Sequence, residues 1–157
     1  MAPMGPLEAP DRGRPMPPQL TGLQRKPSDA ATAALHRILI IDDDPYVGEG
    51  LTRNLRRAFQ VTCVTSAAAA LQLLEGGVQF DVVLCDLEMP VTTGAEFYGE
   101  LAWRHPAALP NIIFMTASVR SERVAHFLKS VPNRHLEKPF APDELRALIG
   151  TLLPAAT

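Results

Sequence analysis

The sequence predicts an α/β fold built on a doubly wound, five-stranded parallel sheet with five helices. Short apolar runs rich in β-branched residues recur along the chain. Each run is followed by a longer segment with apolar residues at helical spacing. Residues typical of helix ends separate the two kinds of segment. Strands that alternate with helices in this way form βαβ units, so the strands run parallel and the crossovers are right-handed.

The predicted strands are short and mostly apolar. The first, RILII at 37–41, is a continuous apolar run, which is typical of a strand buried on both faces of a sheet. The runs QVTCV, DVVLC and NIIFM are interpreted as further strands, and a short fifth strand follows. The five predicted strands span residues 37–41, 60–64, 81–85, 111–115 and 134–137.

Capping residues mark the starts of the first two predicted helices. Asp44 precedes Pro45, which fits an N-cap followed by proline at the first helical position. Ser66 caps an alanine- and leucine-rich helix that ends at Gly76 and Gly77. The later helices are predicted at 94–104, at 119–129 with weak patterning, and at 143–153 with leucine and isoleucine on one face.

The first 35 residues differ in composition from the rest of the chain. They hold seven of the fifteen prolines and almost no periodic apolar residues. Proline fixes φ and removes a backbone donor, so this stretch cannot easily join a helix or a sheet. Residues 1–35 are therefore predicted to be a disordered proline-rich tail, with partner binding as the alternative, and residues 36–157 to be the folded domain.

Composition also limits the classes of function. The net charge of −2 gives no electrostatic case for nucleic acid binding. No apolar run approaches the roughly 18 residues needed to span a membrane, and the N-terminus lacks a secretory pattern. Cys63 and Cys85 lie in apolar runs and are interpreted as buried small hydrophobes, not as a disulfide or zinc site. We therefore expect a cytoplasmic protein that contacts neither nucleic acid nor membrane.

Polar side chains follow four of the predicted strands. In an open parallel sheet the site lies outside the carboxyl ends of the strands, so these side chains should converge. Carboxylates held together repel one another, and a hard divalent cation such as Mg²⁺ relieves the repulsion. A hydroxyl and a lysine beside a metal-bound carboxylate suit a phosphoryl group. The residues concerned are Asp42, Asp43 and Asp44, then Asp86 and Glu88, Thr116, and Lys138.

Each of these residues also has an ordinary structural interpretation. Asp44 is a helix cap rather than a ligand, given the proline that follows it. Asp86 could end a strand in a turn, Thr116 could cap a helix, and Lys138 could be a solvated surface lysine. Their joint placement at the ends of successive strands of one sheet favours a functional site.

The segments IIDDDP, VVLCDLEMP, IIFMTAS and LEKPF resemble, in order and spacing, the receiver domain of two-component response regulators (CheY-like proteins). The resemblance covers about residues 36–154. It implies a flavodoxin-like fold with the strand order 2-1-3-4-5. The segment 114–140 looks more like the receivers of hybrid sensor kinases than like those of DNA-binding regulators, and a stand-alone receiver is expected.

The resemblance also implies a role for each residue of the metal site. Asp86 is similar to the phosphoacceptor. Asp43 resembles the direct carboxylate ligand of Mg²⁺, and Asp42 the acidic neighbour that holds a metal-bound water. Glu88 sits where a backbone carbonyl completes the metal site.

Further positions match the residues that respond to phosphorylation in this family. Thr116 looks like the switch hydroxyl, and Lys138 like the lysine that pairs with the phosphate. The Lys138-Pro139 bond is expected to be cis, as receivers typically have it. The family usually has Tyr or Phe three residues before the lysine, and His135 stands there instead. His135 is thus either an imidazole version of the aromatic switch or a surface histidine without that role.

The reaction implied by the resemblance is phosphoryl transfer to Asp86 from a phosphohistidine on a sensor histidine kinase or a histidine phosphotransfer protein. The domain would then signal through a downstream protein target. It would not be an enzyme in its own right, although receivers partly catalyse their own phosphorylation and dephosphorylation.

Three other functions each fit part of the sequence. A haloacid-dehalogenase phosphatase also uses an aspartate after a strand with Mg²⁺, but it needs a second aspartate where Glu88 stands and a larger core or cap. A receiver-fold docking module would signal without phosphorylation, although the acceptor residues are all present. A DNA-binding regulator needs a second domain, and the first 35 residues have no helix-turn-helix pattern.

Overall fold

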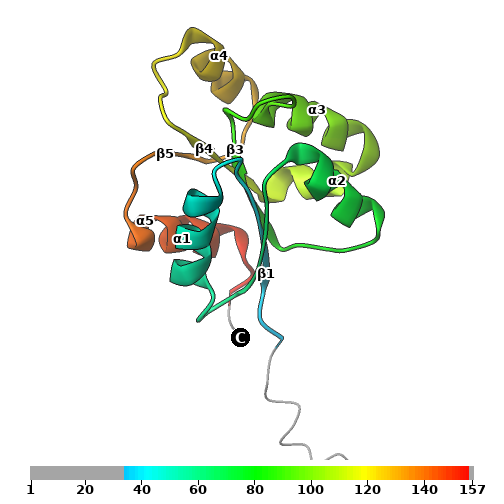
Figure 1. Cartoon of the computed structure of the whole chain (residues 1–157), viewed down its shortest axis with the longest axis vertical. Coiled ribbons are helices and arrows are strands. Elements are labelled where there is room, and N and C mark those ends of the chain that lie inside the picture. The colour runs from blue at the N-terminus through cyan, green and yellow to red at the C-terminus, as the bar shows by residue number, and fades with distance from the viewer. Residues whose placement is uncertain (1–33, 156–157) are drawn as a thin grey trace, which may run out of the picture. The chain divides into compact units, whose positions relative to one another are not determined.

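The computed structural model describes residues 34–155 and has an α/β architecture (Figure 1). Its five strands all run parallel in the order β2-β1-β3-β4-β5, which confirms the predicted fold class. Residues 1–33, which hold nearly all of the predicted tail, lie outside the described residues. The strands are β1 (Arg37–Ile41), β2 (Gln60–Val64), β3 (Val82–Asp86), β4 (Ile112–Thr116) and β5 (His135–Glu137).

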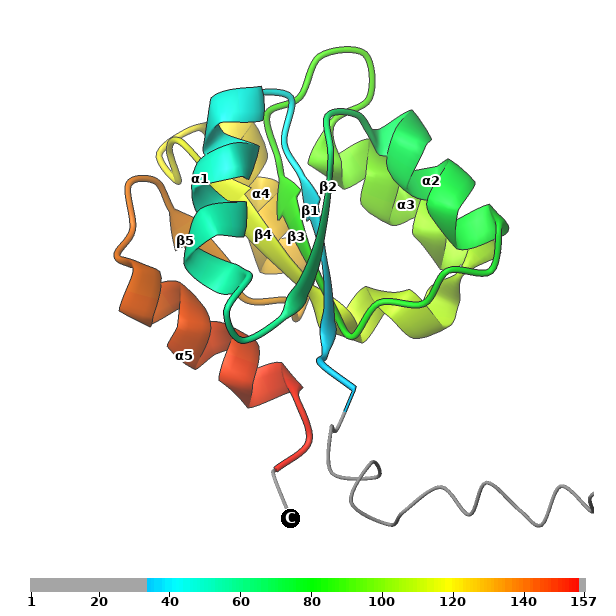
Figure 2. The ribbon, with the colours of Figure 1, turned by 60° about the horizontal axis from the view of Figure 1, so that its bottom comes forward.

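The two faces of the sheet are covered by different helices. In Figure 2, α1 and α5 lie on one side of the sheet, and α2 and α3 lie on the other. The central strands are buried on both faces because their side chains alternate between two apolar clusters. In β1, for example, Leu39 and Ile41 pack toward α2 and α3, whereas Ile38 and Ile40 pack toward α1 and α5.

The helices begin where the sequence places capping side chains. The Asp44 carboxylate accepts a hydrogen bond from the backbone N–H of Tyr46 at 2.9 Å, and Ser66 accepts one from Ala69 at 3.1 Å. Thr93 forms a capping box with the third residue of its helix. The helices are α1 (Pro45–Leu55), α2 (Ala67–Glu75), α3 (Gly94–Arg104), α4 (Glu122–Ser130) and α5 (Pro142–Leu152).

Two segments differ from the sequence-based expectation. Helix α4 begins at Glu122, three residues later than predicted, because residues 119–121 belong to the turn after β4. A 3-10 helix, η2 (Pro106–Asn111), was not predicted. It begins with one proline and contains another, and a proline cannot donate the backbone hydrogen bond that a longer α-helix requires.

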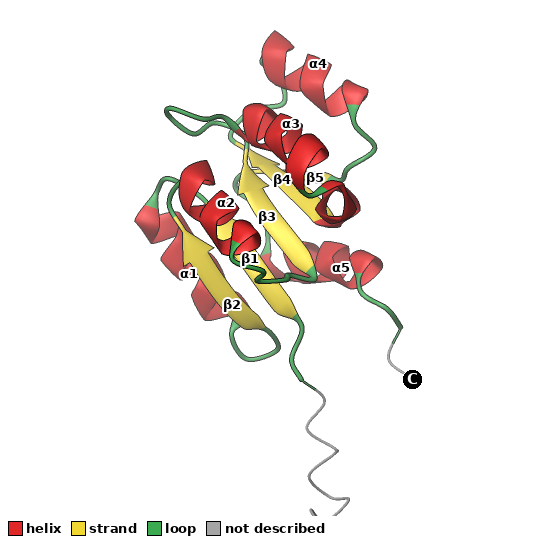
Figure 3. Ribbon diagram, turned by 90° about the vertical axis from the view of Figure 1, so that its right-hand side faces the viewer, coloured by secondary structure: helices red, strands yellow, loops and turns green. Residues whose placement is uncertain are grey.

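The two cysteines have different environments. Cys85 is fully buried in β3, as predicted, and burial raises the pKa of its thiol above the ordinary value. The prediction that Cys63 is buried was wrong: Cys63 is exposed because β2 is an edge strand with only partial cover. Figure 3 shows β2 at one edge of the sheet. In residues 34–155 no helix has the length and apolar character needed to cross a membrane.

Candidate functional site

The carboxyl ends of β1, β3 and β4 bring three polar side chains into a buried position. Asp42, Asp86 and Thr116 are only 1%, 4% and 0% exposed. Asp86 is the last residue of β3 and pairs with Met115 of β4, so Thr116 follows at the same edge. β1 pairs with β3 on the other side, which places Asp42 beside them. The topology therefore gathers these residues as the sequence predicted.

Three carboxylates lie close enough to share one cation. Asp42, Asp43 and Asp86 each offer an oxygen, and these oxygens lie within 4.8 Å of one another. Asp43 is exposed while the other two are buried, so the cluster is open to solvent on one side. Hard carboxylate oxygens are the ligands that Mg²⁺ prefers, and it keeps several waters when bound. The three side chains present therefore fit a magnesium ion.

Lys138 reaches the same cluster from the end of β5. Its Nζ atom donates to Asp42 Oδ2 at 2.7 Å and lies 3.7 Å from Asp86 Oδ2. The Lys138-Pro139 peptide bond is cis, as predicted. The ammonium thus bridges two carboxylates, and in this arrangement it lies nearer to Asp42 than to Asp86.

The electrostatic setting of Asp86 disfavours its charge. Burial is the largest influence and raises the pKa of the Asp86 carboxyl, and the nearby Asp42 and Asp43 act in the same direction. A hydrogen bond from the Glu88 backbone N–H and the charge of Lys138 oppose the shift without cancelling it. Ionised Asp86 therefore gains from any added positive charge at the site.

The same cluster of charges stabilises the charged form of Lys138. Burial alone would lower the pKa of the Lys138 ammonium. The hydrogen bond to Asp42 and the charges of Asp86 and Asp42 outweigh burial, so its pKa is raised above the ordinary value. The lysine therefore stays charged and partly offsets the three carboxylates.

Thr116 and Glu88 connect the site to the loop after β4. The Thr116 hydroxyl donates to the carbonyl of Ser118 and accepts from its N–H, both at 3.2 Å. The Glu88 backbone N–H donates to Asp86 Oδ1 at 3.1 Å. Its carboxylate accepts a hydrogen bond from the backbone N–H of Ala117 at 3.0 Å. The sequence-based interpretation assigned the Glu88 backbone carbonyl to the metal and compared its side chain only with the acid/base aspartate of a phosphatase. No sequence signal points to the side-chain contact with Ala117.

The model of the response regulator receiver domain family matches residues 38–150 of this chain. The chain belongs to that family. Receiver domains are parts of two-component signalling systems and are in general not enzymes, in line with the interpretation of the sequence motifs. The match spans β1 to α5 and so includes the whole acidic site.

Curated relatives support the same assignment. This receiver is 38% identical over 109 residues to the swarming motility regulation protein RssB of Serratia marcescens, covering 69% of this chain and 48% of the relative. It is 33% identical to the response regulator PmrA of Pseudomonas aeruginosa, covering 77% and 54%. It is also 33% identical to the hydrogenase transcriptional regulatory protein HoxA of Bradyrhizobium diazoefficiens, covering 69% and 22%. The chain thus spans about a fifth to a half of the length of these relatives.

Solved structures agree with the fold. The response regulator TrrA of Thermotoga maritima, determined in complex with Mg²⁺ and beryllofluoride, has a TM-score of 0.63 and 29% identity. The chemotaxis protein CheY4 of Vibrio cholerae has a TM-score of 0.65 and 27% identity. In each case the alignment covers 76% of this chain and 100% of the other.

His135 is the one predicted site residue that the structure leaves away from the acidic cluster. It is the first residue of β5 and its side chain is exposed. It pairs in the sheet with Phe114, two residues before Thr116. The exposed position of His135 is compatible with both interpretations, so its switch role stays a prediction.

Proposed function

We propose that this receiver accepts a phosphoryl group on the carboxylate of Asp86. The observation that supports this most is the burial of Asp86 among charged neighbours. This residue is a buried carboxylate within reach of Lys138, beside two further carboxylates that form a site for a cation. Such a group has a nucleophilic oxygen, a fixed position and nearby charges that suit a phosphoryl group.

Asp86, Lys138 and Thr116 have different roles in the phosphoryl transfer. An oxygen of Asp86 attacks phosphorus, a P–O bond forms, and the bond from phosphorus to the histidine nitrogen of the donor breaks. The nitrogen keeps the electron pair of that bond. The Lys138 ammonium moves its charge toward the new phosphoryl oxygens, and the Thr116 hydroxyl exchanges its bond with Ser118 for one with the phosphoryl group.

Asp42, Asp43 and Asp86 would hold Mg²⁺ together with the backbone carbonyl of Glu88. Asp43 and Asp86 would bind it directly, and Asp42 through a water. Bound Mg²⁺ neutralises charge on the reacting oxygens and relieves the repulsion among the carboxylates. Asp42 is already tied to Lys138, which suits an indirect role.

The partners follow from the same reaction. The phosphoryl donor is a sensor histidine kinase or a histidine phosphotransfer protein, and the phosphorylated receiver acts on a downstream protein in the cytoplasm. The net charge of −2 gives no support for nucleic acid as a partner. In this proposal His135 takes the place of the aromatic switch residue and turns toward Thr116 after phosphorylation.

The assignment of the acceptor is tested by intact-mass measurement after incubation with acetyl phosphate and Mg²⁺. We expect the mass of the wild-type protein to rise by one phosphoryl group and the Asp86→Asn protein to stay unmodified. Asp143→Asn is a matched control, because this exposed aspartate lies on α5 and pairs with Arg146. Full phosphorylation of Asp86→Asn would contradict the assignment.

The same experiment separates the proposal from its alternatives. A wild-type protein that gains no mass at any Mg²⁺ concentration would favour a docking module that works without phosphorylation. Repeated turnover, with release of far more inorganic phosphate than protein, would favour a phosphatase. We expect one phosphoryl group per chain.

A further inference from the structure

Glu88 joins the acceptor to the loop after the neighbouring strand. It lies two residues after Asp86, in the loop between β3 and α3. Its backbone N–H donates to Asp86 Oδ1 at 3.1 Å, while its carboxylate accepts from the Ala117 N–H at 3.0 Å. Ala117 directly follows Thr116 and belongs to the loop between β4 and α4. One residue therefore touches both the acceptor side chain and the loop next to it.

The Ala117 amide lies at the same edge of the sheet as the acceptor. Asp86 pairs with Met115 in the ladder between β3 and β4, and the Leu87 N–H donates to the Met115 carbonyl at 2.9 Å. Ala117 follows two residues later and is exposed. Its N–H is thus a hydrogen-bond donor beside the acceptor, and the Glu88 carboxylate occupies it in this structure.

A phosphoryl group on Asp86 would change the balance at this amide. The phosphoryl group carries up to two negative charges and three strong acceptor oxygens, in place of the single charge of the Asp86 carboxylate. The charges repel the exposed Glu88 carboxylate, and the oxygens compete with it for the Ala117 N–H. The Glu88 carboxylate and the phosphoryl oxygens therefore compete for one donor, the Ala117 N–H.

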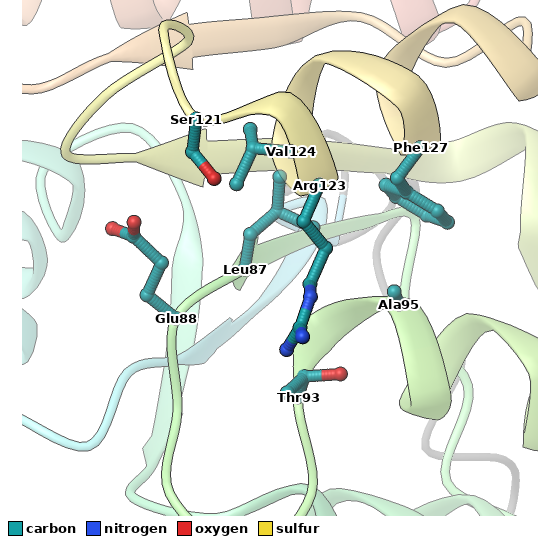
Figure 4. A pocket seen from close by; sticks show the side chains of 8 residues that line it. All are labelled: Leu87, Glu88, Thr93, Ala95, Ser121, Arg123, Val124 and Phe127. Carbon is teal, nitrogen blue, oxygen red and sulfur yellow. The ribbon is translucent and has the colours of Figure 1, made fainter.

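The loop that contains Ala117 leads from the acceptor edge of the sheet to α4. The hydroxyl of Thr116 is bonded to both backbone groups of Ser118, so residues 116–118 form a compact turn. In Figure 4 the Glu88 carboxylate lies on the Ser121 side of a groove between α3 and α4. Residues of both helices and of the loop after β3 line this groove, and Glu88 and Ser121 are among them. Movement of Glu88 would therefore change the surroundings of the residues at the start of α4.

We propose that Glu88 is a positioning residue whose carboxylate holds the Ala117 amide in the unphosphorylated arrangement and is displaced when Asp86 carries a phosphoryl group. The inference rests on the proposed function of Asp86. The Glu88 side chain opposes phosphorylation, so its removal favours the phosphorylated arrangement. The Glu88 backbone carbonyl, assigned to the metal, is unaffected by a side-chain substitution.

The test uses the full chain, with Mg²⁺ and beryllofluoride as the probe. Glu88→Ala removes the acceptor and the charge, whereas Glu88→Gln keeps an acceptor oxygen without the charge. We expect Glu88→Ala to bind beryllofluoride about fivefold more tightly than wild type, the size expected for one net hydrogen bond, with Glu88→Gln in between. Glu122→Ala is the control, because it removes an exposed carboxylate from the first turn of α4.

Hydrogen exchange at the Ala117 amide, measured without Mg²⁺ or beryllofluoride, tests the contact itself. We expect exchange at this amide to be about fivefold faster in Glu88→Ala than in wild type, and restored in part by Glu88→Gln. Equal exchange in wild type and Glu88→Ala, or weaker binding of the probe by Glu88→Ala, would overturn the inference. A wild-type protein that binds no beryllofluoride would instead contradict the function proposed for Asp86.

Discussion

Asp86 is a buried carboxyl whose protonation is coupled to the stability of the domain. Its pKa is raised in the folded protein, chiefly by burial and further by Asp42 and Asp43. The native state therefore binds a proton at higher pH than the unfolded chain does. The free energy of unfolding consequently falls as the pH rises from the unfolded pKa, about 3.9, through the folded pKa.

Removal of this charge should stabilise the metal-free domain at neutral pH. We expect Asp86→Asn to have a higher free energy of unfolding than wild type at pH 7, because a neutral amide avoids the buried charge and its repulsion. The two proteins should differ less as the pH falls through the raised pKa of Asp86, because the wild-type carboxyl then takes up a proton. Urea denaturation with a chelator present measures this, and Asp143→Asn serves as an exposed control. A gain in stability that grows on acidification would contradict the argument.

Val91 is a second residue with an unfavourable property, because its backbone has a positive φ. It has φ of 67° and a fully exposed side chain, and the Thr92 N–H donates across it to the Pro90 carbonyl at 2.8 Å. This γ-turn conformation is strained for a β-branched residue, at a cost of about 1–3 kcal/mol.

Glycine at this position should relieve the strain. We expect Val91→Gly to raise the free energy of unfolding by about 1 kcal/mol, after allowance for the greater freedom of glycine in the unfolded chain. Thr92→Gly is the matched control and should lower it, because Thr92 does not have a positive φ. A loss of stability in Val91→Gly would mean that the exposed side chain makes a stabilising contribution.

At the scale of single elements, the start of α1 separates two adjacent carboxylates by role. The Asp44 side chain caps the helix through the Tyr46 N–H, and the Asp43 side chain belongs to the acidic cluster. The cap was predictable because aspartate before proline is a local pattern.

Substitutions at these two positions should affect different properties of the domain. We expect Asp44→Ala to lower the free energy of unfolding by about 1 kcal/mol, with Mg²⁺ affinity nearly unchanged. Asp43→Ala should remove most of the Mg²⁺ affinity and leave the stability of the metal-free domain nearly unchanged. Urea denaturation and calorimetric titration with Mg²⁺ measure the two effects. The reverse result would show that the register of the site after β1 is off by one residue.

The elements also show which parts of the fold a sequence can predict. Strands β1, β3 and β4 were predicted within one residue, because a strand covered on both faces is a continuous apolar run. The exposure of Cys63 was missed, since the edge position of β2 depends on tertiary pairing. The start of α4 and the 3-10 helix η2 were missed as well, because neither has a strong local signal.

For the molecule as a whole, the parallel topology is the reason that the site was predictable. The strand order 2-1-3-4-5 brings the ends of β1, β3 and β4 together, so residues more than forty positions apart become neighbours. Membership in the family was readable from motifs at those ends. The contacts of Lys138 with Asp42 and of Glu88 with Ala117 were not predicted, because they depend on side-chain conformations.

The folded unit should function without the first 35 residues. Within residues 34–155, both apolar clusters are composed of residues from Ile38 onward, and the acidic site begins at Asp42. We expect deletion of residues 1–35 to leave the melting temperature and the rate of phosphorylation by acetyl phosphate nearly unchanged. Thermal denaturation and intact-mass kinetics of the full and shortened chains measure this. A large loss of stability or of acceptor activity would show that the proline-rich segment contributes to the receiver itself. A role of this segment in partner binding would then need a separate experiment.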